Sequence, residues 1–240
     1  MEREKYAVIM AAGSGSRMGA DKPKQFLEYD GKPILRHTIE LFQKACGDVR
    51  IVVVLPEDYI EYWKSYCLKN NFTCRQSFAK GGLTRFHSVK NALKLIPDGA
   101  VVAVHDGVRP FVSVGLVRKM FALAGDCPAL IPVLPSVDTL KVLDRLTDSG
   151  LPDGLAALAT AEGESVDRCR IYGAQTPQIF HSEILKAAYS QAYDVAFTDD
   201  ASVVSKYGKN LSYVLGERFN IKITTPDDLV FAKALNAILS

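Results

Sequence analysis

The first candidate for chemistry is a loop that combines glycines with cations. The apolar residues 6–10 lead into a segment that contains Gly13, Gly15, Arg17 and Lys24. The glycines allow the backbone to turn with positive φ and to direct several N–H groups into one concavity. The arginine and the lysine add mobile positive charge at the same place. This combination is typical of a polyphosphate site, and it favours a nucleoside triphosphate as the ligand.

The spacing in this loop excludes the two commoner phosphate loops. A Walker A loop requires Gly-x4-Gly-Lys-Ser/Thr, which does not occur in the sequence. A dinucleotide fingerprint requires a third glycine at the position of Met18. The alternative is a purely structural turn between a strand and a helix, but such a turn does not require Arg17 or the run Pro23-Lys-Gln25.

Two further polar segments follow apolar runs. Asp106 and Arg109 come directly after the apolar run 101–105, and ligands bind at the carboxyl ends of strands in open parallel sheets. A carboxylate and a guanidinium there suit a ribose hydroxyl, a metal or a phosphate, and the alternative is a structural ion pair across a turn. Lys222 follows in an apolar segment that we predict to be a strand, where a buried ammonium requires an anion.

A pair of glycines precedes a predicted helix near residue 85. Gly81 and Gly82 permit close approach of the backbone to a planar base, and Ser88 offers a hydroxyl to the edge of that base. The alternative is a glycine turn with Thr84 as the N-cap, which leaves Ser88 without a role. Neither the four histidines nor any Ser/His/Asp set shows metal or triad spacing, so we interpret the histidines as structural.

Composition limits the partners and the compartment. The 240 residues, with 48% hydrophobic content, fit one domain over residues 1–240. The 29 Lys and Arg residues against 27 Asp and Glu residues give a charge of +2, without the basic surplus typical of nucleic-acid or anionic-membrane binding. No signal peptide is recognisable, and no apolar run approaches the roughly 18 residues of a membrane span. Five cysteines without a Cys-x-x-Cys pair suit reduced thiols, and we expect a cytoplasmic protein.

The apolar pattern predicts an α/β fold. Strand-like runs at 6–10, 50–55, 101–105 and 129–133 alternate with helical stripes that begin after Pro33, after Gly82 and near Val117. This order predicts a Rossmann-like, mostly parallel sheet flanked by helices on both faces. Towards the C-terminus we expect helices at 182–193, at 200–207 and after Pro226, with strands near Tyr213 and Ile221.

The regular alternation stops between residues 136 and 171. Residues 136–143 alternate like an exposed strand, 144–166 are rich in Gly, Ala and acidic residues, and 167–171 are predicted to pair back as a return strand. We interpret the segment from about 136 to 171 as a protruding β-arm.

Taken together, the motifs resemble the polyol-phosphate cytidylyltransferases, especially those that act on 2-C-methyl-D-erythritol 4-phosphate. The resemblance covers nearly the whole chain, and its pieces occur in family order: Ala11-Ala-Gly-Ser-Gly-Ser-Arg17, Pro23-Lys-Gln25, Gly81-Gly82 with Arg85 and Ser88, His105-Asp106 with Arg109-Pro110, Asp138-Thr139, Val166-Asp-Arg168, Gln175-Thr-Pro-Gln178, Thr198-Asp199 with Ala201, and Asn220-Ile-Lys222.

This resemblance implies a role for each candidate residue. Arg17 and Lys24 would be catalytic, because they would stabilise the α-phosphate of CTP during transfer. The nucleotide would be bound by Ala11, Ala12, Gly13, Gly15, Gly81, Gly82, Ser88 and Asp106. The polyol phosphate would be bound by Arg109, Thr139, Arg168 and Lys222. Asp106 would also be the candidate ligand for Mg²⁺.

The resemblance implies transfer of CMP from CTP to methylerythritol phosphate, with release of pyrophosphate, in isoprenoid precursor synthesis. It further implies Mg²⁺ as cofactor and a homodimer built by the arm. The chemistry of the residues agrees, since a phosphomonoester is already an anionic nucleophile and needs no general base. Two alternatives stay open: ribitol 5-phosphate as the acceptor, and a non-catalytic nucleotide-sensing domain of the same fold.

Overall fold

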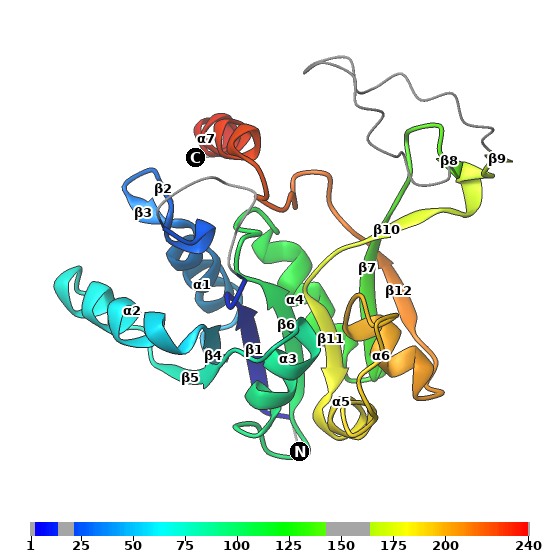
Figure 1. The fold of residues 1–240 in the computed structure, drawn as a ribbon, viewed down its shortest axis with the longest axis horizontal. Coiled ribbons are helices and arrows are strands. Elements are labelled where there is room, and N and C mark those ends of the chain that lie inside the picture. The colour runs from blue at the N-terminus through cyan, green and yellow to red at the C-terminus, as the bar shows by residue number, and fades with distance from the viewer. Residues whose placement is uncertain (1–2, 14–21, 143–163, 240) are drawn as a thin grey trace, which may run out of the picture.

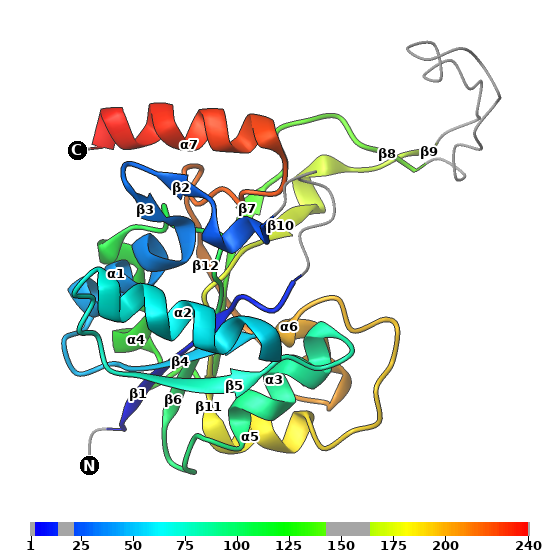
Figure 2. The same cartoon turned by 60° about the vertical axis from the view of Figure 1, so that its left-hand side comes forward.

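The computed structural model describes residues 3–13, 22–142 and 164–239. An eight-stranded sheet forms the centre of the molecule, and helices cover both of its faces (Figures 1 and 2). Within the described residues, no helix is long and apolar enough to cross a membrane.

Strand β1 lies at the centre of a mostly parallel sheet. The order is β10-β7-β11-β6-β1-β4-β5, with β12 paired to β7. Only β10 and β11 run antiparallel to their neighbours. The bounds are β1 Lys5–Met10, β4 Arg50–Leu55, β5 Gln76–Lys80, β6 Val101–Asp106, β7 Ala129–Pro135, β10 Tyr172–Ala174, β11 Gln178–His181 and β12 Ser212–Leu215. The predicted α/β class is therefore confirmed, and so are the four strands predicted from apolar runs.

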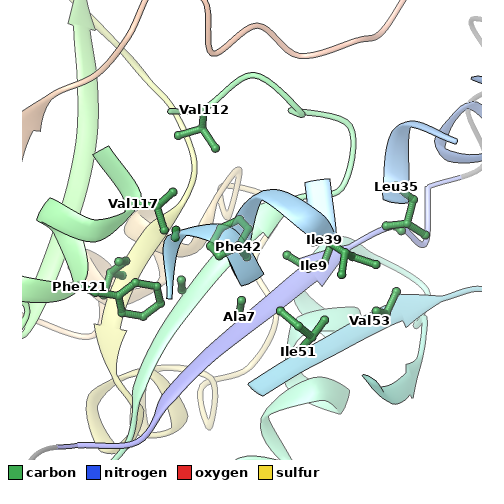
Figure 3. Close-up of a cluster of buried hydrophobic side chains, with 14 of the residues drawn as sticks. Ala7, Ile9, Leu35, Ile39, Phe42, Ile51, Val53, Val112, Val117 and Phe121 are labelled. Atoms are coloured by element: carbon green, nitrogen blue, oxygen red, sulfur yellow. The ribbon is translucent and has the colours of Figure 1, made fainter. Parts of the chain in front are cut away.

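Alternation along the strands divides the core into two layers. Ala7 and Ile9 of β1 pack in the cluster shown in Figure 3, whereas Tyr6 and Val8 pack on the opposite face. The first layer is covered by α1 (Ile34–Ala45), α2 (Glu57–Lys69) and α4 (Val114–Leu123). The second is covered by α3 (Arg85–Leu93), α5 (Ser182–Ala188) and α6 (Asp200–Lys206).

A third apolar cluster lies beside the carboxyl ends of the central strands. It joins the hairpin of β2 (Glu28–Tyr29) and β3 (Lys32–Pro33) to helix α7 (Pro226–Leu239). Its buried members include Tyr29, Val108 and Ile223. The loop that precedes α7 is therefore fixed against the end of β6.

The arm projects from the sheet where the sequence predicts it. Ser136 N donates to Ile171 O at 3.0 Å, and beyond this pair β8 (Lys141–Val142) and β9 (Glu164–Ser165) extend from the body as an antiparallel ribbon (Figures 1 and 2). The return strand predicted at 167–171 is wrong. Asp167 caps a 3-10 turn, η3 (Arg168–Arg170), by accepting a hydrogen bond from Cys169 N at 3.0 Å.

Three other local predictions need correction. The strand predicted at 136–143 is limited to residues 141–142 among those described, and residues 143–163 lie outside the described part of the chain. The helix predicted at 182–193 ends at Ala188. The segment near Ile221 is a loop, so Lys222 does not lie in a strand as predicted. The other C-terminal elements, α6, β12 and α7, are confirmed.

Candidate active site

A cavity of about 490 Å³ opens at the carboxyl ends of the central strands. It lies at the end of β1, which has β4 on one side in the sheet and β6 on the other. The strand order reverses at this point, which is the usual ligand position of open α/β sheets. Its lining includes predicted site residues from five separate segments, namely Ala11, Ala12, Gly13, Lys24, Gly82, Ser88, Asp106 and Lys222. The structure thus brings together residues that are far apart in the sequence.

The loop after β1 is held by a buried glutamine. Gln25, only 1% exposed, donates its Nε2 hydrogens to Ala11 O at 2.7 Å and Gly13 O at 3.4 Å. Gly13 does not have the positive φ predicted for it. Gly15 and Arg17 lie outside the described residues. Gln25 belongs to the Pro23-Lys-Gln25 motif, but its role depends on burial, which the sequence does not show.

An aromatic cluster fixes the turn that carries Lys24. Lys24 begins the 3-10 turn η2 (Lys24–Phe26), and Phe26 is buried between side chains of α2. The ring of Phe26 stacks on Tyr59 with centroids 5.3 Å apart, and it contacts Tyr62 edge-on at 5.0 Å. This packing places the Lys24 side chain in the cavity wall.

The opposite wall is the turn between β5 and α3. A Cβ on Gly81 would lie 2.7 Å from the Cβ of Ala12, so glycine is required there for close approach of the two loops. Ser88 Oγ accepts from Gly82 N at 2.9 Å and donates to Thr84 O at 2.9 Å. Thr84 is the N-cap of α3, as the structural alternative predicts, and the buried Ser88 stabilises the turn.

Asp106 is the carboxylate of the cavity and is surrounded by cations. Its Oδ2 lies 3.0 Å from Lys222 Nζ and 3.2 Å from Arg109 Nε. Burial would raise the pKa of Asp106, but the charges of Lys222, Arg85 and Arg109 outweigh burial and hold the pKa well below its usual range. The carboxylate is therefore ionised. Its contact with Arg109 is the ion pair expected under the structural alternative, and Asp106 is the anion predicted for Lys222.

A second buried carboxylate orients Arg85 in the cavity wall. Arg85 Nη2 donates to Asp200 Oδ2 at 2.5 Å, and Tyr189 Oη donates to Asp200 Oδ1 at 2.6 Å. Burial lowers the pKa of Arg85, but the charge and hydrogen bond of Asp200, together with the charge of Asp106, outweigh burial, so the pKa is raised and the guanidinium stays charged. Neither Asp200 nor Tyr189 was predicted as a site residue, because no sequence signal connects α6 to α3.

His105 is a buried, neutral imidazole that supports the backbone of the site. Its Nε2 lies 3.0 Å from Arg109 O, and its Nδ1 lies 3.1 Å from Thr176 Oγ1, which also accepts a hydrogen bond from Asp106 N at 3.1 Å. Complete burial lowers the pKa of His105 from 6.5 to about 4. The prediction of a structural histidine fits these contacts.

We expect acid to destabilise the fold through His105. Between its usual pKa of 6.5 and the folded value of about 4, the unfolded chain binds more protons, so stability falls as pH falls. At pH 5 the loss relative to pH 7 should be about 2 kcal/mol from this group. Urea unfolding at both pH values should show a smaller difference for His105→Gln, and an equal difference would contradict the assignment.

The two arm residues do not line the cavity of their own chain. Thr139 and Arg168 are both exposed, and Arg168 Nη1 donates to Val137 O at 3.2 Å. Figures 1 and 2 show β8 and β9 projecting beyond the body of the molecule. These side chains face solvent rather than the cations of their own cavity.

The lining suits transfer between phosphates. Among the described lining residues the titratable side chains are Lys24, Arg85, Asp106 and Lys222. Positive charge suits a polyanion, and an ionised phosphate that attacks a second phosphate requires positioning and charge neutralisation more than a base. No group of three or more His, Cys, Asp or Glu side chains within the described ranges could hold a metal. A single carboxylate beside bound phosphates nevertheless fits the usual coordination of Mg²⁺.

Comparisons with known proteins identify the family of this chain. Residues 6–237 match the family model described as IspD, 2-C-methyl-D-erythritol 4-phosphate cytidylyltransferase. The chain is 45% identical to the cytidylyltransferase of that name from Bacteroides thetaiotaomicron, over 95% of this chain and 97% of the relative. It is 43% identical to that from Porphyromonas gingivalis strain W83, over 98% and 99% of the two chains.

Solved structures support the same relationship. The 4-diphosphocytidyl-2C-methyl-D-erythritol synthase from Anaerococcus prevotii matches with a TM-score of 0.77 and 28% identity, over 98% of this chain and 97% of that chain. The 2-C-methyl-D-erythritol 4-phosphate cytidylyltransferase from Francisella tularensis matches with a TM-score of 0.76 and 30% identity, over 96% and 99%. The resemblance seen in the sequence motifs is confirmed, and this chain belongs to the 2-C-methyl-D-erythritol 4-phosphate cytidylyltransferase family.

Proposed function

We propose that this protein transfers CMP from CTP to 2-C-methyl-D-erythritol 4-phosphate, giving CDP-methylerythritol and pyrophosphate for isoprenoid precursor synthesis. The observation that carries the proposal is the cation-lined cavity at the carboxyl ends of β1 and β6, in a chain of this family. The presence of Lys24, Arg85 and Lys222 in this cavity also favours an enzyme over a non-catalytic nucleotide sensor. The family and its relatives favour methylerythritol phosphate over ribitol phosphate as the acceptor.

In this proposal, the cavity aligns two polyanions for in-line attack. An acceptor phosphate oxygen attacks the α-phosphorus of CTP, the bond to the bridging oxygen breaks, and pyrophosphate leaves with that oxygen. Lys24, with Arg17, stabilises the charge that develops on the α-phosphate. Lys222 and Arg109 receive the acceptor phosphate close to Asp106, where their positive charge is concentrated.

The nucleotide is framed by the loop after β1 and the turn between β5 and α3. Ala11, Ala12 and Gly13 approach the ribose and phosphates with backbone groups, while the Gly81-Gly82 turn faces the base. Ser88 contributes indirectly, because its hydroxyl is engaged by Gly82 N and Thr84 O and so fixes the shape of the turn. Asp106 meets the ribose and is the residue that would hold Mg²⁺. When bound with CTP, this ion would neutralise charge on the phosphate oxygens.

The acceptor site is completed, in our proposal, by a second copy of the chain. Thr139 and Arg168 are exposed on an arm that leaves the body, so a partner's cavity is the place where they can meet a substrate. We therefore propose one domain with a dimerisation arm at about 136–171. The five cysteines are free thiols, which supports a reducing, cytoplasmic location.

A pyrophosphate-release assay tests the proposed reaction. The purified protein is supplied with CTP, Mg²⁺ and either methylerythritol 4-phosphate or ribitol 5-phosphate. We expect turnover with the first acceptor, little with the second, and none after chelation of the metal. Comparable turnover with both acceptors, or none with either, would overturn the proposed substrate.

Base selection should depend on Ser88. CTP should be preferred to UTP and ATP, by as much as about 10⁴-fold where buried groups hydrogen-bond the base. Ser88→Ala should reduce the preference for CTP by more than it lowers the rate with CTP. The reason is that the substitution removes the hydrogen bond that holds the turn at Gly82. Competition assays with paired nucleotides measure the ratio, and Ser190→Ala, a change on the surface after α5, is the matched control.

A further inference from the structure

The position of Lys222 is not determined by secondary structure. Residues 220–224 form neither helix nor strand, and Lys222 is nevertheless 3.0 Å from Asp106 Oδ2. A flexible four-carbon side chain on a loop requires the backbone on either side to be fixed. After Lys222 the loop is held by Ile223, which is fully buried and donates its N–H to Val108 O at 2.9 Å.

Before Lys222 the loop is held by Asn220. This residue is 0% exposed, and its Nδ2 donates to Thr176 O at 2.8 Å and Gln175 Oε1 at 3.3 Å. Its Oδ1 has no hydrogen-bond partner among the residues that the structure describes. The amide is therefore oriented by its two donor contacts, which join the loop to the segment between β10 and β11.

The same residue contacts the other members of the charged cluster. Asn220 O accepts a hydrogen bond from Arg109 Nη1 at 2.7 Å. Thr176, which accepts from Asn220 through its carbonyl, also accepts from Asp106 N through its hydroxyl at 3.1 Å. Asn220 is thus connected to the backbone of Lys222, the guanidinium of Arg109 and, through Thr176, the strand end that carries Asp106.

We infer that Asn220 is a positioning residue for the transfer reaction, acting through Lys222. This inference rests on the proposed function, in which Lys222 and Arg109 hold the acceptor phosphate. Asn220 is not among the residues that line the cavity. Its role is specific to an amide, since Nδ2 faces two oxygen acceptors that an aspartate would repel.

A double-mutant cycle with Lys222 tests the inference. Asn220→Ala should lower kcat/KM for methylerythritol phosphate by about 10²-fold, the cost of a misplaced binding group, while the KM for CTP changes little. Lys222→Ala should lower kcat/KM by at least as much. The double variant should have the same kcat/KM as Lys222→Ala alone, because Asn220 cannot position a lysine that has been removed. Asn70→Ala, which removes one surface hydrogen bond to Tyr66 O, is the control.

The outcomes separate this inference from the proposed function. If the fold-loss in kcat/KM of the double variant equals the product of the two single losses, Asn220 does not act through Lys222. That result would overturn the positioning role and leave the role of Lys222 intact. A folded Lys222→Ala with unchanged kcat/KM would overturn both. Asn220→Ser retains a shorter donor and repeats the cycle where Asn220→Ala does not fold. A partial recovery by serine relative to alanine, at equal thermal stability, would support positioning over a purely structural role.

Discussion

Replacement of Lys24 by alanine should lower kcat for CMP transfer by about 10²- to 10³-fold, as loss of a charge-stabilising donor does in other enzymes. Binding of CTP should weaken much less, because the charge of Lys24 is needed most when negative charge develops on the α-phosphate. The turn that carries Lys24 is anchored by Phe26, so the alanine variant should retain the fold. Steady-state kinetics and thermal unfolding measure the two properties.

Lys22→Ala is the matched control for this experiment. Lys22 is exposed, lies two residues before Lys24, and is not among the residues that line the cavity. Its removal should leave kcat within about twofold, since an isolated surface charge contributes little. A Lys24→Ala variant with normal kcat and only a raised KM for CTP would contradict this prediction. It would show that Lys24 binds the substrate and the transition state equally well.

If the arm completes the site of the partner chain, mixing two inactive variants should restore activity by subunit exchange. Lys24→Ala and Arg168→Ala homodimers should each be nearly inactive. After subunit exchange, half of the dimers are mixed, and each mixed dimer has one intact site, so activity should recover to about a quarter of wild type. The reason is that Lys24 belongs to the cavity of its own chain, whereas Arg168 is exposed on the projecting arm.

The control for complementation uses two cavity variants. Lys24 and Lys222 line the same cavity, so mixing Lys24→Ala with Lys222→Ala leaves each site with one defect and should restore no activity. Differently tagged chains establish that exchange has taken place. Verified mixed dimers of Lys24→Ala and Arg168→Ala that stay inactive would show that Arg168 serves its own chain.

The sequence predicted the elements whose pattern is unambiguous. The apolar runs of β1, β4 and β6 are buried on both faces, and α1 begins directly after Pro33. By contrast, β5 is an edge strand in which only Ala79 is buried, and α2 fully buries only Trp63, so neither has a clear apolar period. Residues 167–171 do not form the predicted return strand, because Asp167 caps a local 3-10 turn instead.

Most of the residues that line the cavity were predictable, but the contacts among them were not. Glycines, cations and Asp106 were recognisable from residue type and from their position after apolar runs. The pairing of Arg85 with Asp200 joins helices on a layer of the fold that sequence spacing does not reveal. The roles of Gln25 and Asn220 depend on their burial and on their partners from distant segments, which the sequence does not show.

The central place of β1 links catalysis to the folding of the whole chain. β1 pairs with strands that begin at Arg50 and Val101, and the cavity beside it also needs Lys222 from near the C-terminus. No short fragment contains these contacts, so a nascent or partly unfolded chain has no nucleotide site. Ligands that bind only the folded state stabilise it by mass action, by about 2.7 kcal/mol at one hundred times the Kd. Cellular CTP should therefore protect this protein against degradation as well as serve as its substrate.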